Sequence, residues 1–176
     1  ALCKGCTAGQ YSSSTTKCEG CGAGTYSDGS ANAACLDCGA GQYSTGTANK
    51  ACSNCDAGKI STGTENKACT GCGAGQYSSS TTKCEGCGAG TYSDGSANAA
   101  CLDCGAGQYS TGTANKACSN CSAGKISTGT ENKACTDCGA GQYSTAAGAS
   151  SCSNCLKGTY STEVGAFEAL TCIKCL

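Results

Sequence analysis

The stretch Cys-Gly-Ala-Gly-Thr-Tyr-Ser-Asp-Gly-Ser-Ala-Asn-Ala-Ala-Cys-Leu-Asp-Cys, residues 21–38, contains the pattern from which the whole chain is built. A cysteine is followed by x-Ala-Gly-x-Tyr-Ser, a polar segment and a Cys-x-x-Cys pair. The glycine allows a positive φ or a close backbone approach. The residues around the tyrosine favour a short β-strand, and the polar segment favours a turn. The stretch therefore predicts a small hairpin-like loop with cysteines at both ends.

The same unit recurs along all 176 residues, and every one of the 22 cysteines belongs to a Cys-x-x-Cys pair. The gap between successive pairs is 13 residues in seven cases, 11 in two and 16 in the last, so the dominant unit has 17 residues. Residues 7–69 recur almost unchanged at 73–135, a shift of 66 residues. Such internal repetition indicates an array of small units. We expect one continuous tandem array over residues 1–176, with super-repeats at 3–68 and 69–134 and an atypical last unit at 155–175.

The composition favours cross-links over a single apolar core. The chain has 22 Cys and 28 Gly but only eight Tyr, one Phe and no Trp or Met. This cysteine fraction is typical of secreted disulfide scaffolds, which predicts an extracellular or cell-surface location. A net charge of -1 excludes a nucleic-acid footprint, and no stretch approaches the roughly 18 apolar residues of a membrane span. We predict small disulfide-rich repeats forming an elongated solenoid or rod of β-hairpin-like loops, with essentially no helix and no single globular core.

Two disulfide schemes are compatible with the spacing. Each second cysteine of a pair can join the first cysteine of the next pair, or adjacent pairs can alternate, as in Cys3–Cys18 with Cys6–Cys21, and sequence does not fix connectivity. A neighbour bridge across one gap contributes about 3 kcal/mol through the unfolded chain. The neighbour scheme, which we favour, consists of Cys6–Cys18, Cys21–Cys35, Cys38–Cys52, Cys55–Cys69, Cys72–Cys84, Cys87–Cys101, Cys104–Cys118, Cys121–Cys135, Cys138–Cys152 and Cys155–Cys172. It leaves Cys3 and Cys175 open or available for intermolecular bonds.

Zinc binding and redox catalysis are the alternative uses of these cysteines. Two pairs could bind zinc through four thiolates, but the 13-residue gap is slightly short, the number of pairs is odd, and the chain has no His. A redox Cys-x-x-Cys works at a helix N-terminus, and no helical pattern is present. The carboxylates are scattered, and there is no Arg. We therefore expect no metal, no cofactor, no catalytic residue and no enzymatic activity.

The motif Cys-x-x-Cys-x-Ala-Gly-x-Tyr-Ser, followed by another Cys-x-x-Cys, resembles the ephrin-receptor-like (GCC-type) cysteine-rich repeat. It is also similar to the first half of a tumour-necrosis-factor-receptor module. The resemblance covers essentially the whole chain and implies an extracellular, elongated protein in which neighbouring cysteines close each Gly-x-Tyr loop. These families usually have Pro after the second cysteine, where this chain has Gly22, Gly39 and Asp56. The periodic cysteines also show a looser likeness to surface antigens of ciliates and other protists.

In every repeat, a Tyr or Ile stands immediately before the Ser of the x-Ala-Gly-x-Tyr-Ser pattern. We predict that each packs on the disulfide and backbone of the next unit, which would build a narrow continuous core. The alternative is an exposed series that binds sugars or partner chains. The residues are Tyr11, Tyr26, Tyr43, Ile60, Tyr77, Tyr92, Tyr109, Ile126, Tyr143 and Tyr160.

The serine that follows each of these positions is a candidate for O-glycosylation, because Ser and Thr crowd every gap. Solvated turn chemistry is the alternative. The candidates are Ser12, Ser27, Ser44, Ser61, Ser78, Ser93, Ser110, Ser127, Ser144 and Ser161.

Uniform repetition favours a structural protein. We expect a stiff rod that belongs to a fibril, surface coat or cell appendage, with head-to-tail or lateral self-association into a homopolymer. The alternative is the stalk or ectodomain of a receptor, adhesin or protist surface antigen. A ligand site of that kind should break the repeat symmetry, as Val164, Phe167 and Leu170 do in the 16-residue last gap.

Overall fold

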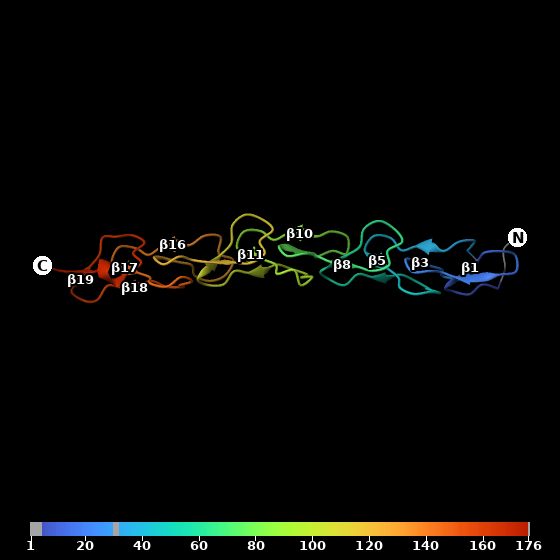
Figure 1. Cartoon of the computed structure of the whole chain (residues 1–176), viewed down its shortest axis with the longest axis horizontal. Coiled ribbons are helices and arrows are strands. Elements are labelled where there is room, and N and C mark those ends of the chain that lie inside the picture. Colours follow the sequence, from blue (N-terminus) through green and yellow to red (C-terminus); the bar gives the residue numbers. More distant parts are fainter. Residues whose placement is uncertain (1–4, 30–31, 176) are drawn as a thin grey trace. The chain divides into compact units, whose positions relative to one another are not determined.

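The computed structural model describes residues 5–29 and 32–175, which form ten antiparallel two-stranded hairpins in chain order (Figure 1). We number them hairpins 1 to 10. Their strand pairs are β1 (Gln10–Ser12) with β2 (Cys18–Gly20), β3 (Thr25–Tyr26) with β4 (Leu36–Asp37), β5 (Gln42–Tyr43) with β6 (Ser53–Asn54), β7 (Lys59–Ile60) with β8 (Thr70–Gly71), β9 (Gln76–Tyr77) with β10 (Glu85–Gly86), β11 (Thr91–Tyr92) with β12 (Leu102–Asp103), β13 (Gln108–Tyr109) with β14 (Ser119–Asn120), β15 (Lys125–Ile126) with β16 (Thr136–Asp137), β17 (Gln142–Tyr143) with β18 (Ser153–Asn154), and β19 (Thr159–Tyr160) with β20 (Ile173–Lys174). One 3-10 turn, η1 (Ala169–Thr171), lies in the last loop. The prediction of hairpin units with essentially no helix is confirmed.

One disulfide closes each hairpin. The bridges are Cys6–Cys18, Cys21–Cys35, Cys38–Cys52, Cys55–Cys69, Cys72–Cys84, Cys87–Cys101, Cys104–Cys118, Cys121–Cys135, Cys138–Cys152 and Cys155–Cys172. The structure thus has neighbour pairing and not the alternating scheme. Cys175 carries an exposed free thiol, and Cys3 lies outside the described residues.

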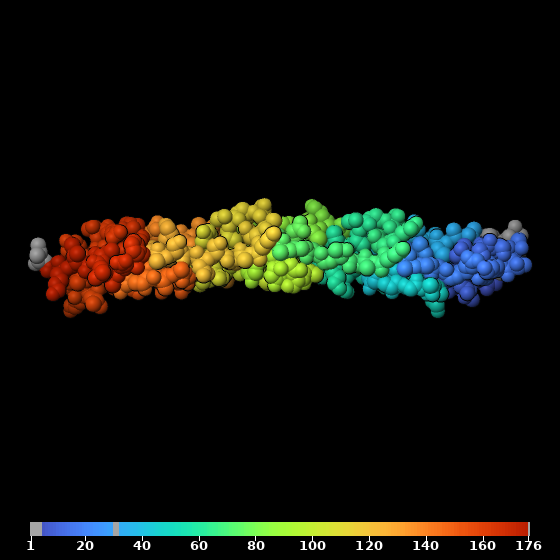
Figure 2. Space-filling model, in the orientation of Figure 1, coloured from blue at the N-terminus to red at the C-terminus, as the bar shows by residue number. Residues whose placement is uncertain are grey.

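Backbone contacts divide the chain into two compact units. The first comprises residues 1–73, 77–85 and 96–100, and the second comprises 74–76, 86–95 and 101–176. The same hairpin pattern builds both units. Within the second unit, residues 101–175 follow one another along the unit in the order of the sequence (Figure 2). No helix in the described part of the chain has the length and apolarity needed to cross a membrane.

The interior of each unit is made of sulfur, hydroxyls and glycine backbone. Nine of the bridge cysteines are at most 8 % exposed, and the ten serines after the Tyr or Ile positions are at most 7 % exposed. Ala166 is the one other apolar side chain in this buried set among the described residues. Large apolar side chains remain partly or largely exposed, so neither unit has a conventional hydrophobic core.

Successive hairpins are joined by backbone hydrogen bonds. In the second unit the Gly90 N–H donates to the Ser110 carbonyl at 2.9 Å, and the Ser93 N–H donates to the Asn115 carbonyl at 3.0 Å. The bond from glycine to the next serine carbonyl recurs at all nine joints between the ten hairpins. A hairpin alone leaves these amides without acceptors, so each hairpin needs its neighbour.

At the first eight of the nine joints, the glycine also lies close to the hairpin after next. Gly90 of hairpin 6 has a φ of 88°, and a Cβ built on it would lie 2.2 Å from the carbonyl oxygen of Glu131 in hairpin 8. Gly24 is equally close to Glu65 in the first unit. A side chain at this position would therefore meet backbone that cannot move aside cheaply. Three consecutive hairpins therefore meet at such a glycine.

Three glycine-to-alanine substitutions separate the two reasons for glycine at the joint, which are the positive φ and the lack of space for a Cβ. Gly88→Ala should change the free energy of unfolding by less than about 0.5 kcal/mol, because Gly88 faces open space without a positive φ. Gly112→Ala should cost about 1 kcal/mol, because φ is 71° but nothing lies within 4 Å. Gly90→Ala should cost about 2–4 kcal/mol, since strain and overpacking combine. Denaturant unfolding of the unreduced chain measures all three, and equal costs for Gly90→Ala and Gly112→Ala would contradict the close contact.

Candidate functional site: the joint between successive hairpins

At several joints a buried serine hydroxyl donates to a backbone carbonyl of the preceding hairpin, as in Ser44, Ser61, Ser110 and Ser127. Ser110 Oγ of hairpin 7 donates to the Thr91 carbonyl at 3.0 Å and accepts from the Gly90 N–H at 3.0 Å. Ser44 makes the same two bonds, to Thr25 and from Gly24, in the first unit. Because these hydroxyls are buried, the bonds form away from competing water. A small hydroxyl fits this space, where a larger side chain would separate the hairpins.

The ten serines predicted as O-glycosylation sites are at most 7 % exposed: Ser12, Ser27, Ser44, Ser61, Ser78, Ser93, Ser110, Ser127, Ser144 and Ser161. All ten side chains are buried, so a glycan on any of them would have to displace the adjoining backbone. The sequence pattern did not separate these serines from the exposed hydroxyls of the turns. Their strict position after Tyr or Ile was the signal of an interior role.

The Tyr and Ile series is partly covered. Nine of the ten side chains are half-buried, and Tyr160 is exposed. Each lies on a strand opposite a residue of its own hairpin, as Tyr26 does opposite Leu36 and Tyr109 opposite Ser119. The serines and nine of the bridge cysteines are more deeply buried, and packing of each Tyr or Ile on the next unit stays a prediction.

An asparagine at the end of the polar turn reaches back to the preceding hairpin. Asn115 Nδ2 donates to the Gly88 carbonyl at 2.9 Å, and Asn66 Nδ2 donates to the Gly39 carbonyl at 3.0 Å. The preceding residue, Ala114, adopts a φ of 57° so that its N–H can donate to the Cys87 carbonyl at 2.8 Å. Turn chemistry alone does not predict this role of Asn. The recurrence of Asn at a fixed place was the available signal.

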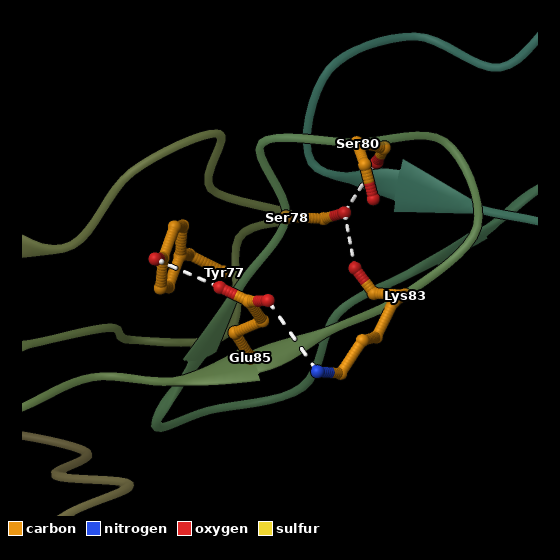
Figure 3. Close-up of polar contacts among 5 residues, drawn as sticks. All are labelled: Tyr77, Ser78, Ser80, Lys83 and Glu85. Atoms are coloured by element: carbon orange, nitrogen blue, oxygen red, sulfur yellow. Dashed lines mark hydrogen bonds and ion pairs between the residues drawn. The ribbon is translucent and has the colours of Figure 1, made fainter.

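Hairpins 1 and 5, which have the shortest loops, each carry a surface polar cluster, and Figure 3 shows the one in hairpin 5. Tyr77 Oη donates to Glu85 Oε2 at 3.1 Å, and Lys83 Nζ donates to Glu85 Oε1 at 3.5 Å. Ser78 Oγ donates to the carbonyls of Ser80 and Lys83, the latter at 2.6 Å. The Ser78 hydroxyl thereby links the two ends of the short loop, and the Glu85 carboxylate links the side chains of Tyr77 and Lys83.

The carboxylates of this cluster shift the pKa of their neighbours. The hydrogen bond to Glu85 raises the pKa of Tyr77, as the bond to Glu19 raises that of Tyr11. The hydrogen bond from Lys17 is the main cause that lowers the pKa of Glu19, followed by that from Tyr11. A lowered pKa stabilises the fold above the ordinary glutamate pKa, and this contribution is lost as pH falls through the lowered value. Because the cluster is exposed, its contribution to stability is small.

Hairpin 10 differs from the others by its exposed apolar side chains. Leu156 and Leu170 are 79 % and 85 % exposed, and Val164, Phe167 and Ile173 are also exposed. The predicted symmetry-breaking residues therefore lie on the surface. A hollow of about 160 Å³ lies beside them, and its lining is Tyr143, Leu156, Thr159, Ala169 and Cys172.

The edge of hairpin 10 also exposes the donors that join hairpins elsewhere. The amides of Gly158 and Ser161 have no hydrogen-bond acceptor among the described residues. The glycines Gly141 and Gly158 have φ values of 75° and 83°, but nothing lies within 4 Å of a Cβ built on either.

One known family resembles part of the chain. Residues 124–172 match the family model described as tyrosine-protein kinase ephrin type A/B receptor-like. The chain is a cysteine-rich repeat protein. The matched segment starts at Gly124, whose added Cβ would lie 2.1 Å from the Gly165 carbonyl oxygen, and ends at the last bridge at Cys172. It thus includes one complete contact between a hairpin and the hairpin after next. No curated protein matches this cysteine-rich repeat chain.

None of the described residues forms a group of three or more His, Cys, Asp or Glu side chains suited to a metal ion. Twenty of the cysteines are held in disulfides, so their sulfur atoms are not thiolates. The joint therefore holds successive hairpins together through backbone contacts.

Substitution Ser110→Ala tests the interior hydroxyls. It removes a buried donor and leaves the Thr91 carbonyl without that bond, so the free energy of unfolding should fall by about 1–3 kcal/mol. Thr113→Ala in the same hairpin is the control, because Thr113 is exposed, and it should stay within about 0.5 kcal/mol of the parent chain. Chemical denaturation without reductant measures both. A neutral Ser110→Ala variant would contradict the interior role.

Substitution Glu85→Gln tests the surface cluster. The neutral amide no longer opposes ionisation of Tyr77, so the pKa of Tyr77 should fall toward its ordinary value. Ultraviolet titration of tyrosinate in the unreduced chain measures the shift. Glu168→Gln is the matched control, and its titration curve should overlie that of the parent. An unchanged curve for Glu85→Gln would show that the hydrogen bond does not persist in solution.

Proposed function

We propose that the chain is an extracellular structural protein whose repeats form a stiff disulfide-stapled rod within a fibril, surface coat or cell appendage. The observation that carries this proposal is that successive hairpins in each unit are joined by the same set of contacts. Each hairpin is closed by its own bridge. Hairpins 1 to 9 are hydrogen-bonded to the next hairpin, and hairpins 1 to 8 are in close contact with the one after it. Resistance to bending follows, because bending one joint would break contacts that span three hairpins.

The chemistry of the chain suits an oxidising, extracellular setting. Ten bridges hold units that lack a hydrophobic core, and cytosolic reductants would open such bonds. The family matched at residues 124–172 is named for receptors at the cell surface. Both points support an extracellular or cell-surface location and a role without catalysis.

Self-association is the partner interaction that we propose, with Cys175 as the covalent link in the described part of the chain. Its exposed thiol can join a cysteine thiol of another copy, with loss of two protons and transfer of two electrons to a disulfide oxidant of the secretory pathway. Cys3 is the complementary cysteine in the repeat pattern, and it lies outside the described residues.

The structural proposal predicts a covalent ladder. Chain purified without reductant should show multimers in denaturing electrophoresis, and electron microscopy of native material should show fibrils. Cys175→Ser should abolish the ladder and leave ten internal bridges intact by mass. Only short, dispersed monomers in native material would rule out the polymer.

A receptor or adhesin stalk is the second candidate, and it is favoured by the exposed apolar side chains of hairpin 10. In that case the hollow beside Leu156 would bind the ligand. Replacement of Val164, Phe167 and Leu170 by Ser would then abolish binding of the chain to cells. The same change would leave fibrils intact if those side chains only cap the array.

A further inference from the structure

We propose that Asn120 carries an N-linked glycan, attached to its exposed amide nitrogen during secretion of the chain. The residue begins the sequence Asn120-Cys121-Ser122, which has the Asn-x-Ser pattern of an N-glycosylation acceptor. Neither the joints nor the proposed rod accounts for this pattern. The inference rests on the proposed extracellular location, because glycan transfer of this kind takes place on secreted chains.

The described asparagines occupy two structural positions. Those in the polar turns are half-buried, and several of their amide groups donate to carbonyls of an earlier hairpin, as Asn115 Nδ2 does to Gly88 at 2.9 Å. A glycan on such a nitrogen would meet the earlier hairpin. The asparagines at the ends of strands β6, β14 and β18 are instead exposed, and they are Asn54, Asn120 and Asn154.

The side chain of Asn120 leaves its nitrogen open to solvent. Its Oδ1 accepts a hydrogen bond from Gln108 Nε2 at 3.1 Å, whereas its Nδ2 has no hydrogen-bond acceptor in the described part of the chain. Cys121 is fully buried, and Asn120 and Ser122 on either side of it are exposed. This alternation is typical of an extended segment, in which residues two apart face the same side. The acceptor nitrogen and the serine of the pattern therefore share the solvent-facing side.

The loop that faces Asn120 has small side chains. A Cβ built on Gly148 of hairpin 9 would lie 3.5 Å from Asn120 Cγ. The equivalent residues of hairpins 3 and 7 are Ala48 and Ala114, each of which donates its N–H to the carbonyl of a bridge cysteine, as Gly148 does. Residues 146–151 of the facing loop are all Ala, Gly or Ser. The space beside this amide is therefore free of the methyl group that stands in the other two joints.

The first super-repeat provides an internal comparison. Asn54 is the counterpart of Asn120 one super-repeat earlier. Its Oδ1 accepts a hydrogen bond from Gln42 Nε2 at 3.1 Å, which matches the geometry in hairpin 7. Asp56, however, stands where the second copy has Ser122. The same local structure thus occurs once with and once without the hydroxyl residue of an acceptor.

Glycan transfer has to precede closure of the disulfide beside the acceptor. A bond forms between Asn120 Nδ2 and the anomeric carbon of an oligosaccharide carried on a polyprenyl diphosphate. The bond between sugar and phosphate breaks, the diphosphate leaves, and Nδ2 loses one proton. Cys121 pairs with Cys135, 14 residues further along the chain, which the ribosome adds about 1–3 s later. Asn120 is therefore first presented on a chain that has not yet closed this bridge.

A glycan at Asn120 assigns one solvent-facing surface to the second unit. Glycans are bulky and solubilising, so the surface around Asn120 and Gly148 would stay in contact with water in a coat or fibril. Lateral contacts between chains would have to use other surfaces.

The test is the intact mass of the full-length chain secreted by eukaryotic cells, measured with and without digestion by peptide-N-glycosidase. We expect the parent chain to carry one N-glycan that digestion removes. Ser122→Asp copies the residue of the first super-repeat at an exposed site, so it should fold and lose the glycan completely. Ser122→Thr is the matched control and should retain it.

A second variant makes the reverse change. Asp56→Ser completes the acceptor pattern at Asn54, whose side chain is exposed, and it should add a second glycan. If Ser122→Asp is not secreted, this gain of mass decides, because an Asp56→Ser chain without a second glycan would overturn the inference.

The outcomes separate the inference from the proposed function. A parent chain that is secreted with ten bridges but without an N-glycan would overturn the inference and leave the extracellular role intact. A glycan that survives Ser122→Asp would lie elsewhere and would overturn the assignment to Asn120. Native material with reduced cysteines would overturn both the extracellular role and the glycan.

Discussion

The approach of backbone to backbone at the Ala-Gly-x-Tyr glycine is the constraint on which the rest of the structure depends. With a Cβ at Gly90, the loop of hairpin 8 could not reach hairpin 6. That loop brings the Asn132 side chain within 3.1 Å of the Gly105 carbonyl oxygen. One missing atom thus allows both the turn geometry and the side-chain bond. Glycine is required here for space as well as for φ, which distinguishes it from the turn glycines.

Disulfides stabilise single hairpins, whereas joints connect one hairpin to the next. Each bridge lies within one hairpin, spanning 12 to 17 residues of sequence, and stabilises it by restricting the unfolded chain. No bridge links one hairpin to another among the described residues, so cohesion along each unit depends on backbone bonds, buried serines and asparagines. The bridges make small hairpins possible, and the joints turn them into an array.

Much of this fold could be predicted from the sequence because it is local. Cysteine spacing indicated the unit and the favoured pairing, and Gly-x-Tyr-Ser indicated the strand. The deep burial of the serines was not predicted, because apolar side chains are the usual occupants of an interior. Ser110 is buried in its joint, whereas the larger Tyr109 beside it is only half-buried. The contact between Gly90 and Glu131 joins units two apart, which the sequence of a single unit does not show.

A core of cystine, hydroxyl and backbone has a thermodynamic consequence. The heat-capacity change of unfolding comes mainly from newly hydrated apolar surface, whereas exposing polar surface lowers it. Here the buried serines contribute polar surface, and large side chains such as Leu156 and Leu170 are already in water. The curve of stability against temperature should therefore be flatter than that of an ordinary domain of this length. A repeat chain with this interior would keep similar cohesion over a wide range of temperature.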